Sequence, residues 1–136
     1  MATIRNLQLE VQLNGGPNDP VRVVVDYDIV FNSLDRNENV RYRELARVIG
    51  DDTGIPGDIL NAGDDLLRVM LDQVTETAGQ QAVRRHLERT ISRSTANEDP
   101  SGFAPKDELR AEVSLRDVQG LLQPVFAESN LVEDRF

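Results

Sequence analysis

Histidine is the side chain that most often acts as a general base near neutral pH, and this chain has only one, His86. A Ser-His-Asp triad would have to use it. The G-x-S-x-G motif of a nucleophile elbow is absent, and Ser92 and Ser94 follow on the same run of sequence, where triad geometry is hard to form. We interpret His86 as a surface histidine and expect no catalytic residue in the chain.

Metal sites built from cysteine and histidine are excluded by composition, because there is no cysteine and zinc usually needs several such ligands. Hard cations such as Ca²⁺ are not excluded in this way. The stretch DRNEN gives Asp35, Asn37 and Asn39 the spacing of a calcium loop, but Val40 stands where the loop needs glycine and Ala46 where it needs a bidentate glutamate. An EF-hand is therefore rejected.

A looser cation or small-ligand site is the first alternative. The segment 50–65 is rich in aspartates that would repel one another unless water, arginine or Ca²⁺ screens them. These are Asp51, Asp52, Asp58, Asp64 and Asp65. The other interpretation is a solvated loop that uses aspartate in turns and caps.

A hydrolase with two carboxylates is a further alternative, because the fold, and not the sequence spacing, brings such pairs together. The chain has no tryptophan, two tyrosines and four phenylalanines, which leaves few aromatic platforms for a sugar. It also lacks the glycine-rich motifs that cradle phosphates. We expect no nucleotide chemistry and no cofactor.

Arginines form one basic concentration in the segment 84–93. On a strand, Arg85, Arg89 and Arg93 would share a face. That stripe could receive a carboxylate-rich partner or a second copy of the chain. Alternatively, these arginines pair across strands with Glu108, Glu112 and their neighbours as structural ion pairs.

The elements that must position these residues are mostly strands. Apolar and polar residues alternate over 7–13 and again over 21–31, and the turn-forming residues of 14–20 lie between them, which predicts a hairpin. A third strand is predicted over 109–115 by the same alternation. A Gly/Pro-containing loop precedes it, so we expect residues 82–93 to be its hairpin partner.

Three segments are ambiguous between strand and helix: 42–50, 64–77 and 82–93. Tyr42, Leu45 and Ile49 have helical spacing, and Gly50 would suit a helix C-terminus. We predict strands, because three clear strands without long helices are most simply completed by further strands.

The expected fold is a two-layer antiparallel β-sandwich of about six or seven strands, with at most one or two short helices. In architecture it resembles compact sandwich domains of the immunoglobulin-like or transthyretin-like kind. The Trp and Cys pair of antibody domains is absent, so no family residues are carried over.

We expect the sandwich to occupy residues 1–117 and a C-terminal tail, 118–136, to pack on the domain or on a partner. Apolar residues in the tail have a helical spacing that Pro124 interrupts. The partner-binding candidates in the tail are Leu121, Leu122, Val125 and Phe126.

The net charge of −9 should repel nucleic acid and anionic membranes, and no apolar run approaches the ~20 residues of a membrane helix. The lack of cysteine fits a reducing compartment, so we expect a cytoplasmic protein. Together these observations predict a non-catalytic interaction or structural module that self-associates or joins a larger assembly.

Overall fold

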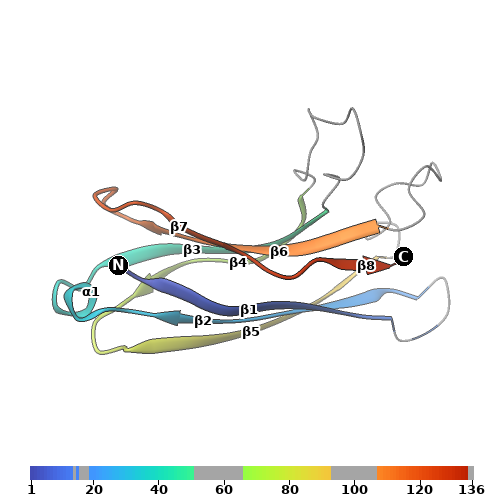
Figure 1. The fold of residues 1–136 in the computed structure, drawn as a ribbon, viewed down its shortest axis with the longest axis horizontal. Coiled ribbons are helices and arrows are strands. Elements are labelled where there is room, and N and C mark those ends of the chain that lie inside the picture. The colour runs from blue at the N-terminus through green and yellow to red at the C-terminus, as the bar shows by residue number, and fades with distance from the viewer. Residues whose placement is uncertain (14, 16–18, 51–65, 93–106, 135–136) are drawn as a thin grey trace.

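The computed structural model describes residues 1–13, 15, 19–50, 66–92 and 107–134. Over these ranges the chain forms eight strands in two antiparallel sheets and one short helix, which confirms the expected all-β sandwich (Figure 1). Sheet A has the order β1-β2-β5 and consists of β1 (Thr3–Gln12), β2 (Val21–Val30) and β5 (Ala82–Ile91). Sheet B has the order β4-β3-β6-β7, with β8 also paired to β6; it consists of β3 (Arg41–Gly50), β4 (Leu66–Glu76), β6 (Asp107–Asp117), β7 (Val125–Glu128) and β8 (Val132–Asp134).

The predicted hairpin is present as β1 and β2, with Leu9 opposite Val25. Its register shifts at a β-bulge between Arg5 and Gln8. Asn6 lies in the bulge with φ of 55°, the left-handed region that asparagine tolerates better than most residues. Its side chain donates a hydrogen bond to Asp28 Oδ2 at 2.9 Å, which helps to hold this conformation.

The ambiguous segments are strands. β3 lies at the centre of sheet B, between β4 and β6, and Ala46 faces Leu71 on one side and Val113 on the other. Residues 82–91 likewise form strand β5. The alternative helices are therefore not formed.

The expected pairing of residues 82–93 with the strand over 109–115 is wrong. β5 instead pairs with β2 in sheet A, where Leu87 faces Val25, while β6 pairs with β3 in sheet B. Hairpin loops usually have about 2–5 residues. The connection from Ile91 to Asp107 is much longer, so it can carry the chain from one sheet to the other.

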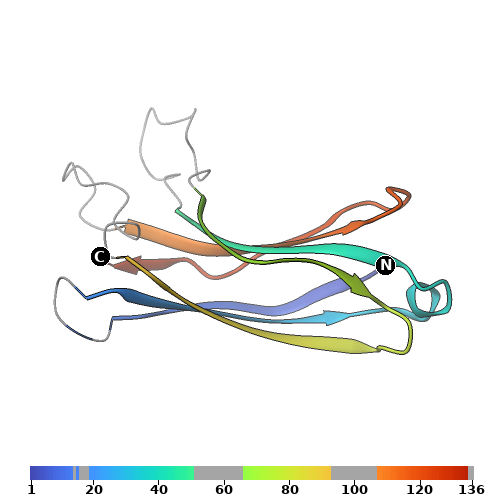
Figure 2. The ribbon, with the colours of Figure 1, turned by 180° about the vertical axis from the view of Figure 1, so that it is seen from behind.

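The C-terminal segment adds two strands to sheet B. β7 and β8 both pair with β6, where Leu115 faces Val125 and Leu109 faces Val132. Between these strands Asn130 turns toward sheet A, and its side-chain amide accepts from the Leu9 backbone N–H at 2.9 Å and donates to the Leu9 carbonyl at 3.1 Å. The segment thus completes one sheet and binds the edge of the other. Figure 2 shows the two-layer arrangement from behind.

The hydrophobic core lies between the sheets, where alternate residues of each strand point inward. Four inward residues of β6 are almost completely buried: Leu109, Ala111, Val113 and Leu115. They meet the inward valines and Ile29 of β2. Full burial of such a side chain contributes about 1.5–3 kcal/mol, so this contact is the main source of stability.

At one end, helix α1 (Ser33–Asn37) carries the chain from β2 in sheet A to β3 in sheet B. The Asn32 side chain accepts from the Asp35 backbone N–H at 2.8 Å and so caps the helix N-terminus. The rings of Phe31 and Tyr42 stack beside it, with centroids 6.3 Å apart. Among the described residues no helix is long and apolar enough to cross a membrane.

Candidate interaction surface

Some predicted site residues lie outside the described residues. These are the five aspartates of the proposed cation site, Asp51, Asp52, Asp58, Asp64 and Asp65, together with Arg93. Within the described part of the chain, no group of three or more His, Cys, Asp or Glu side chains could hold a metal ion. The cation site therefore stays a prediction.

Arg85 lies in the interior of the sandwich and spans the two sheets. It projects from β5 and binds both carboxylate oxygens of Glu44 on β3, with Nε–Oε2 at 3.1 Å and Nη2–Oε1 at 3.0 Å. Glu44 is fully buried, and the Arg85 side chain is 23% exposed. The hydrogen bonds to Glu44 raise the pKa of Arg85 further above its usual value, so the guanidinium stays charged.

Two hydroxyl groups complete the environment of Glu44. The Tyr27 hydroxyl donates to Oε2 at 2.5 Å and the Thr75 hydroxyl donates to Oε1 at 2.7 Å. Burial, followed by the hydrogen bond to Glu44, raises the pKa of Tyr27 well above its usual value, so the phenol keeps its proton. Both oxygens of this carboxylate are therefore hydrogen-bonded, which is the arrangement of a structural ion pair.

Arg89 also connects the two sheets, at the side where β5 and β4 are the edge strands. Its guanidinium donates to the Met70 carbonyl at 3.2 Å and so joins β5 to β4. The cross-strand partners expected for these arginines were Glu108 and Glu112, and that pairing is wrong for Arg85, which binds Glu44. Glu112 is instead paired with Arg47 and Arg110 of sheet B.

His86 lies on the outer face of sheet A, between two carboxylates. Its Nδ1 is 2.5 Å from Asp26 and its Nε2 is 2.8 Å from Glu88. Glu88 also forms an ion pair with Arg22. The hydrogen bonds that its ring donates to Glu88 and Asp26 raise the pKa of His86.

A further buried carboxylate belongs to Asp35 of α1. Its Oδ1 accepts a hydrogen bond from the Tyr42 hydroxyl at 3.1 Å, and its Oδ2 lies 3.4 Å from the amino group of Met1. Burial raises the pKa of Tyr42 to about 12. Asp35 thus holds α1 against β3.

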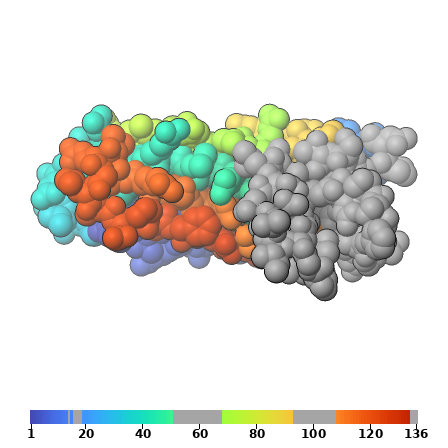
Figure 3. Space-filling model, turned by 90° about the horizontal axis from the view of Figure 1, so that it is seen from above, coloured from blue at the N-terminus to red at the C-terminus, as the bar shows by residue number. Residues whose placement is uncertain are grey.

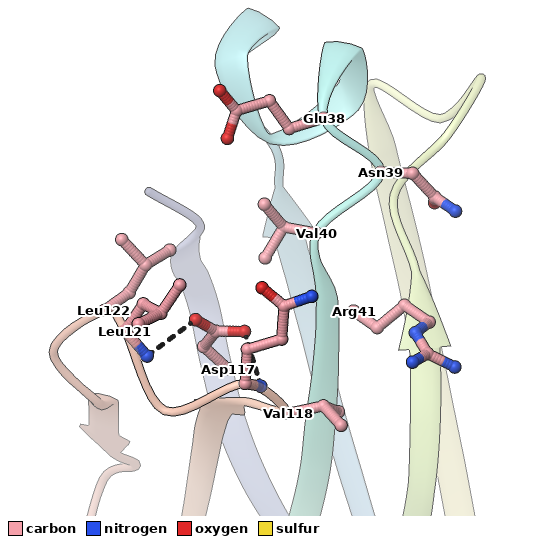
Figure 4. Close-up of a pocket in the computed structure, with 9 residues that line it drawn as sticks. Glu38, Asn39, Val40, Arg41, Asp117, Val118, Leu121 and Leu122 are labelled. Carbon is pink, nitrogen blue, oxygen red and sulfur yellow. Dashed lines mark hydrogen bonds between the residues drawn. The ribbon is translucent and has the colours of Figure 1, made fainter.

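A shallow cavity of about 110 Å³ lies between the α1–β3 connection and the turn that joins β6 to β7 (Figure 4). The Asp117 carboxylate accepts from the backbone N–H groups of Gln119 and Leu121, both at 3.0 Å, and so fixes the turn. Leu121 is 79% exposed and Leu122 is 37% exposed at its rim. Two of the predicted partner-binding residues therefore lie at the surface, at the mouth of this cavity.

The outer face of sheet B, formed by the outward residues of β3, β4, β6 and β7, carries further exposed apolar side chains. Because residues alternate along each strand, Phe126 of β7 faces Ser114 of β6, which faces Leu45 of β3. Phe126 is 54% exposed, and Val74 on β4 is 53% exposed. Val125, which precedes Phe126, points inward and packs against the core. Figure 3 looks onto this face and shows β7 and the β6–β7 turn, in orange and red, beside β3 in green.

Arginines gather at one end of this outer face. Arg43 of β3 lies directly opposite Arg116 of β6, and Arg41 lies two residues further along β3. Arg43 forms a bidentate ion pair with Asp72, but Arg41 and Arg116 form no ion pair within the described residues. Glu76 of β4 lies directly opposite Arg41, so acidic residues stand beside two of the three arginines.

No protein-family model, no curated protein and no solved structure matches this chain.

The outer face of sheet B was not found from the sequence. Its signal is the alternation in RYRELAR, which places Arg41, Arg43, Leu45 and Arg47 on one side of a strand. A charged residue in the inward register, Glu44, obscured that alternation. The candidates Leu121, Leu122 and Phe126 were found from the sequence and lie in or beside this face.

Proposed function

We propose that this chain is a non-catalytic interaction module that self-associates through the outer face of sheet B. One observation carries the proposal. Nine large hydrophobic side chains are exposed among the described residues, and six of them lie on sheet B or in its β6–β7 turn: Val69, Val74, Val118, Leu121, Leu122 and Phe126. A concentration of this kind is typical of a protein-binding surface.

The outer face of sheet A gives the contrast. None of the nine exposed hydrophobic side chains lies on it. It is covered instead by polar contacts such as the Arg22–Glu88 ion pair and the pairing of His86 with Asp26. The two faces therefore differ in the free energy that a partner would gain by covering them, at roughly 25 cal/mol per Å² of apolar surface.

The residue types on sheet B also favour protein binding. Aromatic residues and arginine are enriched at interfaces and often dominate their energetics. Phe126 supplies the aromatic anchor. Arg116 lies on the neighbouring strand β6, and Arg41 and Arg43 lie one strand further away, on β3. The net charge of −9 argues against nucleic acid or an anionic membrane as the partner.

Two features support a non-catalytic role in the cytoplasm. The fully buried carboxylate Glu44 has both oxygens occupied by Arg85, Tyr27 and Thr75. The absence of cysteine from the sequence fits a reducing compartment.

Sedimentation velocity on two aspartate variants tests the proposal. Phe126→Asp places a charge on the outer face of sheet B, and the matched control Thr90→Asp places one at an exposed strand position on the outer face of sheet A. We expect Phe126→Asp to weaken self-association by roughly tenfold or more, equivalent to ~1.4 kcal/mol, and Thr90→Asp to leave it unchanged. Equal effects of both variants, with both folded by circular dichroism, would place the interface elsewhere.

A further inference from the structure

We propose that the buried polar network around Glu44 selects the register of the strands rather than raising the free energy of unfolding. The network joins four strands: it contains Tyr27 of β2, Glu44 of β3, Thr75 of β4 and Arg85 of β5. The inference does not depend on self-association, because it concerns how the strands and sheets of one chain pair and pack.

Apolar packing alone selects this register weakly. Three successive inward residues of β2 are valines, Val21, Val23 and Val25, and all three are fully buried. A slip of one residue between β2 and β5 would turn the buried side chains outward, so the alternation of the sequence forbids it. A slip of two residues keeps each side chain on its own face and sets one valine where another stood.

The network distinguishes the registers that apolar packing does not. Tyr27 lies directly opposite Arg85 in the β2–β5 pair, and both side chains bind Glu44 of the other sheet, with Tyr27 Oη–Oε2 at 2.5 Å and Arg85 Nη2–Oε1 at 3.0 Å. A two-residue slip would move Arg85 about 7 Å along the strand away from its place opposite Tyr27, at ~3.4 Å per residue. Glu44 could then not bind both groups at these distances.

The same network marks the pairing within sheet B. Glu44 lies directly opposite Gln73 of β4. The Thr75 hydroxyl, two residues further along β4, donates to Glu44 Oε1 at 2.7 Å and accepts from Arg85 at 3.3 Å. This contact matters for β4, because its ladder with β3 already shifts register at two places. One carboxylate therefore connects the β2–β5 pair, the β3–β4 pair and the two sheets.

A slipped register would leave a buried charge without its partner. Glu44 is fully buried, and within the described part of the chain Arg85 is the one cation that pairs with it. Breaking a buried ion pair is strongly unfavourable, whereas replacing the whole pair by apolar groups of similar volume is often neutral or stabilising. The network thus disfavours wrong registers more than it stabilises the native one.

Engineered disulfides can report the register directly, because the native chain contains no cysteine. Asp26 and His86 lie directly opposite each other on the outer face of sheet A, so Asp26→Cys/His86→Cys reports the native register. Asp26→Cys combined with Arg84→Cys or with Glu88→Cys reports a slip of two residues in either direction. In the native register these diagonal pairs are about 7–8 Å apart, which is too far for an unstrained disulfide.

The test variant replaces the whole network by apolar residues: Tyr27→Phe, Glu44→Leu, Thr75→Val and Arg85→Met in one chain. We expect this quadruple variant to fold, with a melting temperature no lower than that of the native chain. The fraction cross-linked through the two slipped cysteine pairs should rise by roughly tenfold or more over that in the native background. The matched control Arg43→Leu/Asp72→Leu removes an exposed ion pair of nearly the same geometry and should leave the register unchanged.

Mass spectrometry after mild oxidation measures the cross-links, and circular dichroism shows whether each chain is folded. Slipped cross-links in the quadruple variant, and not in the native or control backgrounds, support the proposal. A folded quadruple variant that cross-links only in the native register overturns it, because apolar packing then suffices. A quadruple variant that does not fold also overturns it, because the network then supplies stability itself. Slipped cross-links in the native background as well would show that the network does not select one register.

Discussion

Glu44 and Arg85 reach toward each other from opposite sheets and form a bidentate ion pair in the interior, with N–O distances of 3.0 and 3.1 Å. The exposed pair of Arg43 and Asp72 has nearly the same geometry, at 3.1 and 3.0 Å. The two pairs differ in burial: Glu44 is fully buried, whereas the Asp72 side chain is 41% exposed.

This contrast predicts that replacing the arginine by methionine has very different effects on stability in the two pairs. Arg85→Met leaves a buried carboxylate without its charge partner and should reduce the free energy of unfolding by about 3 kcal/mol or more. Arg43→Met, the matched control, should cost less than about 1 kcal/mol because water screens the exposed pair. Urea unfolding of both variants measures the difference. A similar loss in both would show that burial of Glu44 does not matter to the energetics of this pair.

The Glu44–Arg85 pair also shows why part of the fold was not predictable from the sequence. β1, β2 and β6 were predicted because their inward residues are apolar and their outward residues are mostly polar. In β3 and β5 the inward register contains Glu44 and Arg85, so the period of two was hidden and a helix looked equally compatible. These residues are 41 positions apart, and only the packing of the two sheets brings them together.

The C-terminal segment was also hard to predict. Its apolar spacing is helical, yet Leu121 and Leu122 belong to an exposed turn, and the strands β7 and β8 have only four and three residues. Strands this short give too few alternations to define a period. The contact of Asn130 with the backbone of Leu9 depends on a sheet edge more than 100 residues away in sequence, for which the sequence has no local signal.

The pKa of His86 predicts a pH dependence of stability. Its hydrogen bonds to Glu88 and Asp26 raise this pKa above the ~6.5 of an unfolded chain. Protonation of His86 therefore favours the folded state. Its contribution to the free energy of unfolding is fully present below pH ~6.5 and is lost as pH rises through the pKa of the folded state. The melting temperature should decline as pH rises across this range, and this decline should be absent in His86→Gln. Because His86 is the only histidine, its ring protons also report the pKa directly by NMR. A folded pKa below 6.5 would contradict this account.

Asn130 is predicted to protect the free edge of β1. Asn130→Ala removes the side-chain partners of the Leu9 backbone N–H and carbonyl groups and should cost about 1–2 kcal/mol. Asn130→Asp keeps the acceptor for the Leu9 N–H and should have a smaller effect on that group. Hydrogen exchange at the Leu9 amide measures the local change. Unchanged exchange in Asn130→Ala would mean that other groups shield this edge.

A chain that ends at Asp117 should be less stable than the full chain. The truncation removes β7 and β8, exposes the edge of β6 and deletes the contact between Asn130 and Leu9. Exposed edges of this kind promote aggregation. We expect a lower melting temperature together with increased light scattering. A truncated chain that does not aggregate and has the same melting temperature as the full chain would show that these strands contribute little to the stability of the sandwich.

The self-association of the native chain is tested most directly by its mass in solution. Light scattering over a concentration series should show the mass rising from the 15.2 kDa of one chain toward twice that value, because we propose that the outer face of sheet B binds a second copy. A mass that stays at 15.2 kDa up to roughly millimolar concentration would contradict self-association, since even a weak dimer with a Kd near ~1 mM would be detected there.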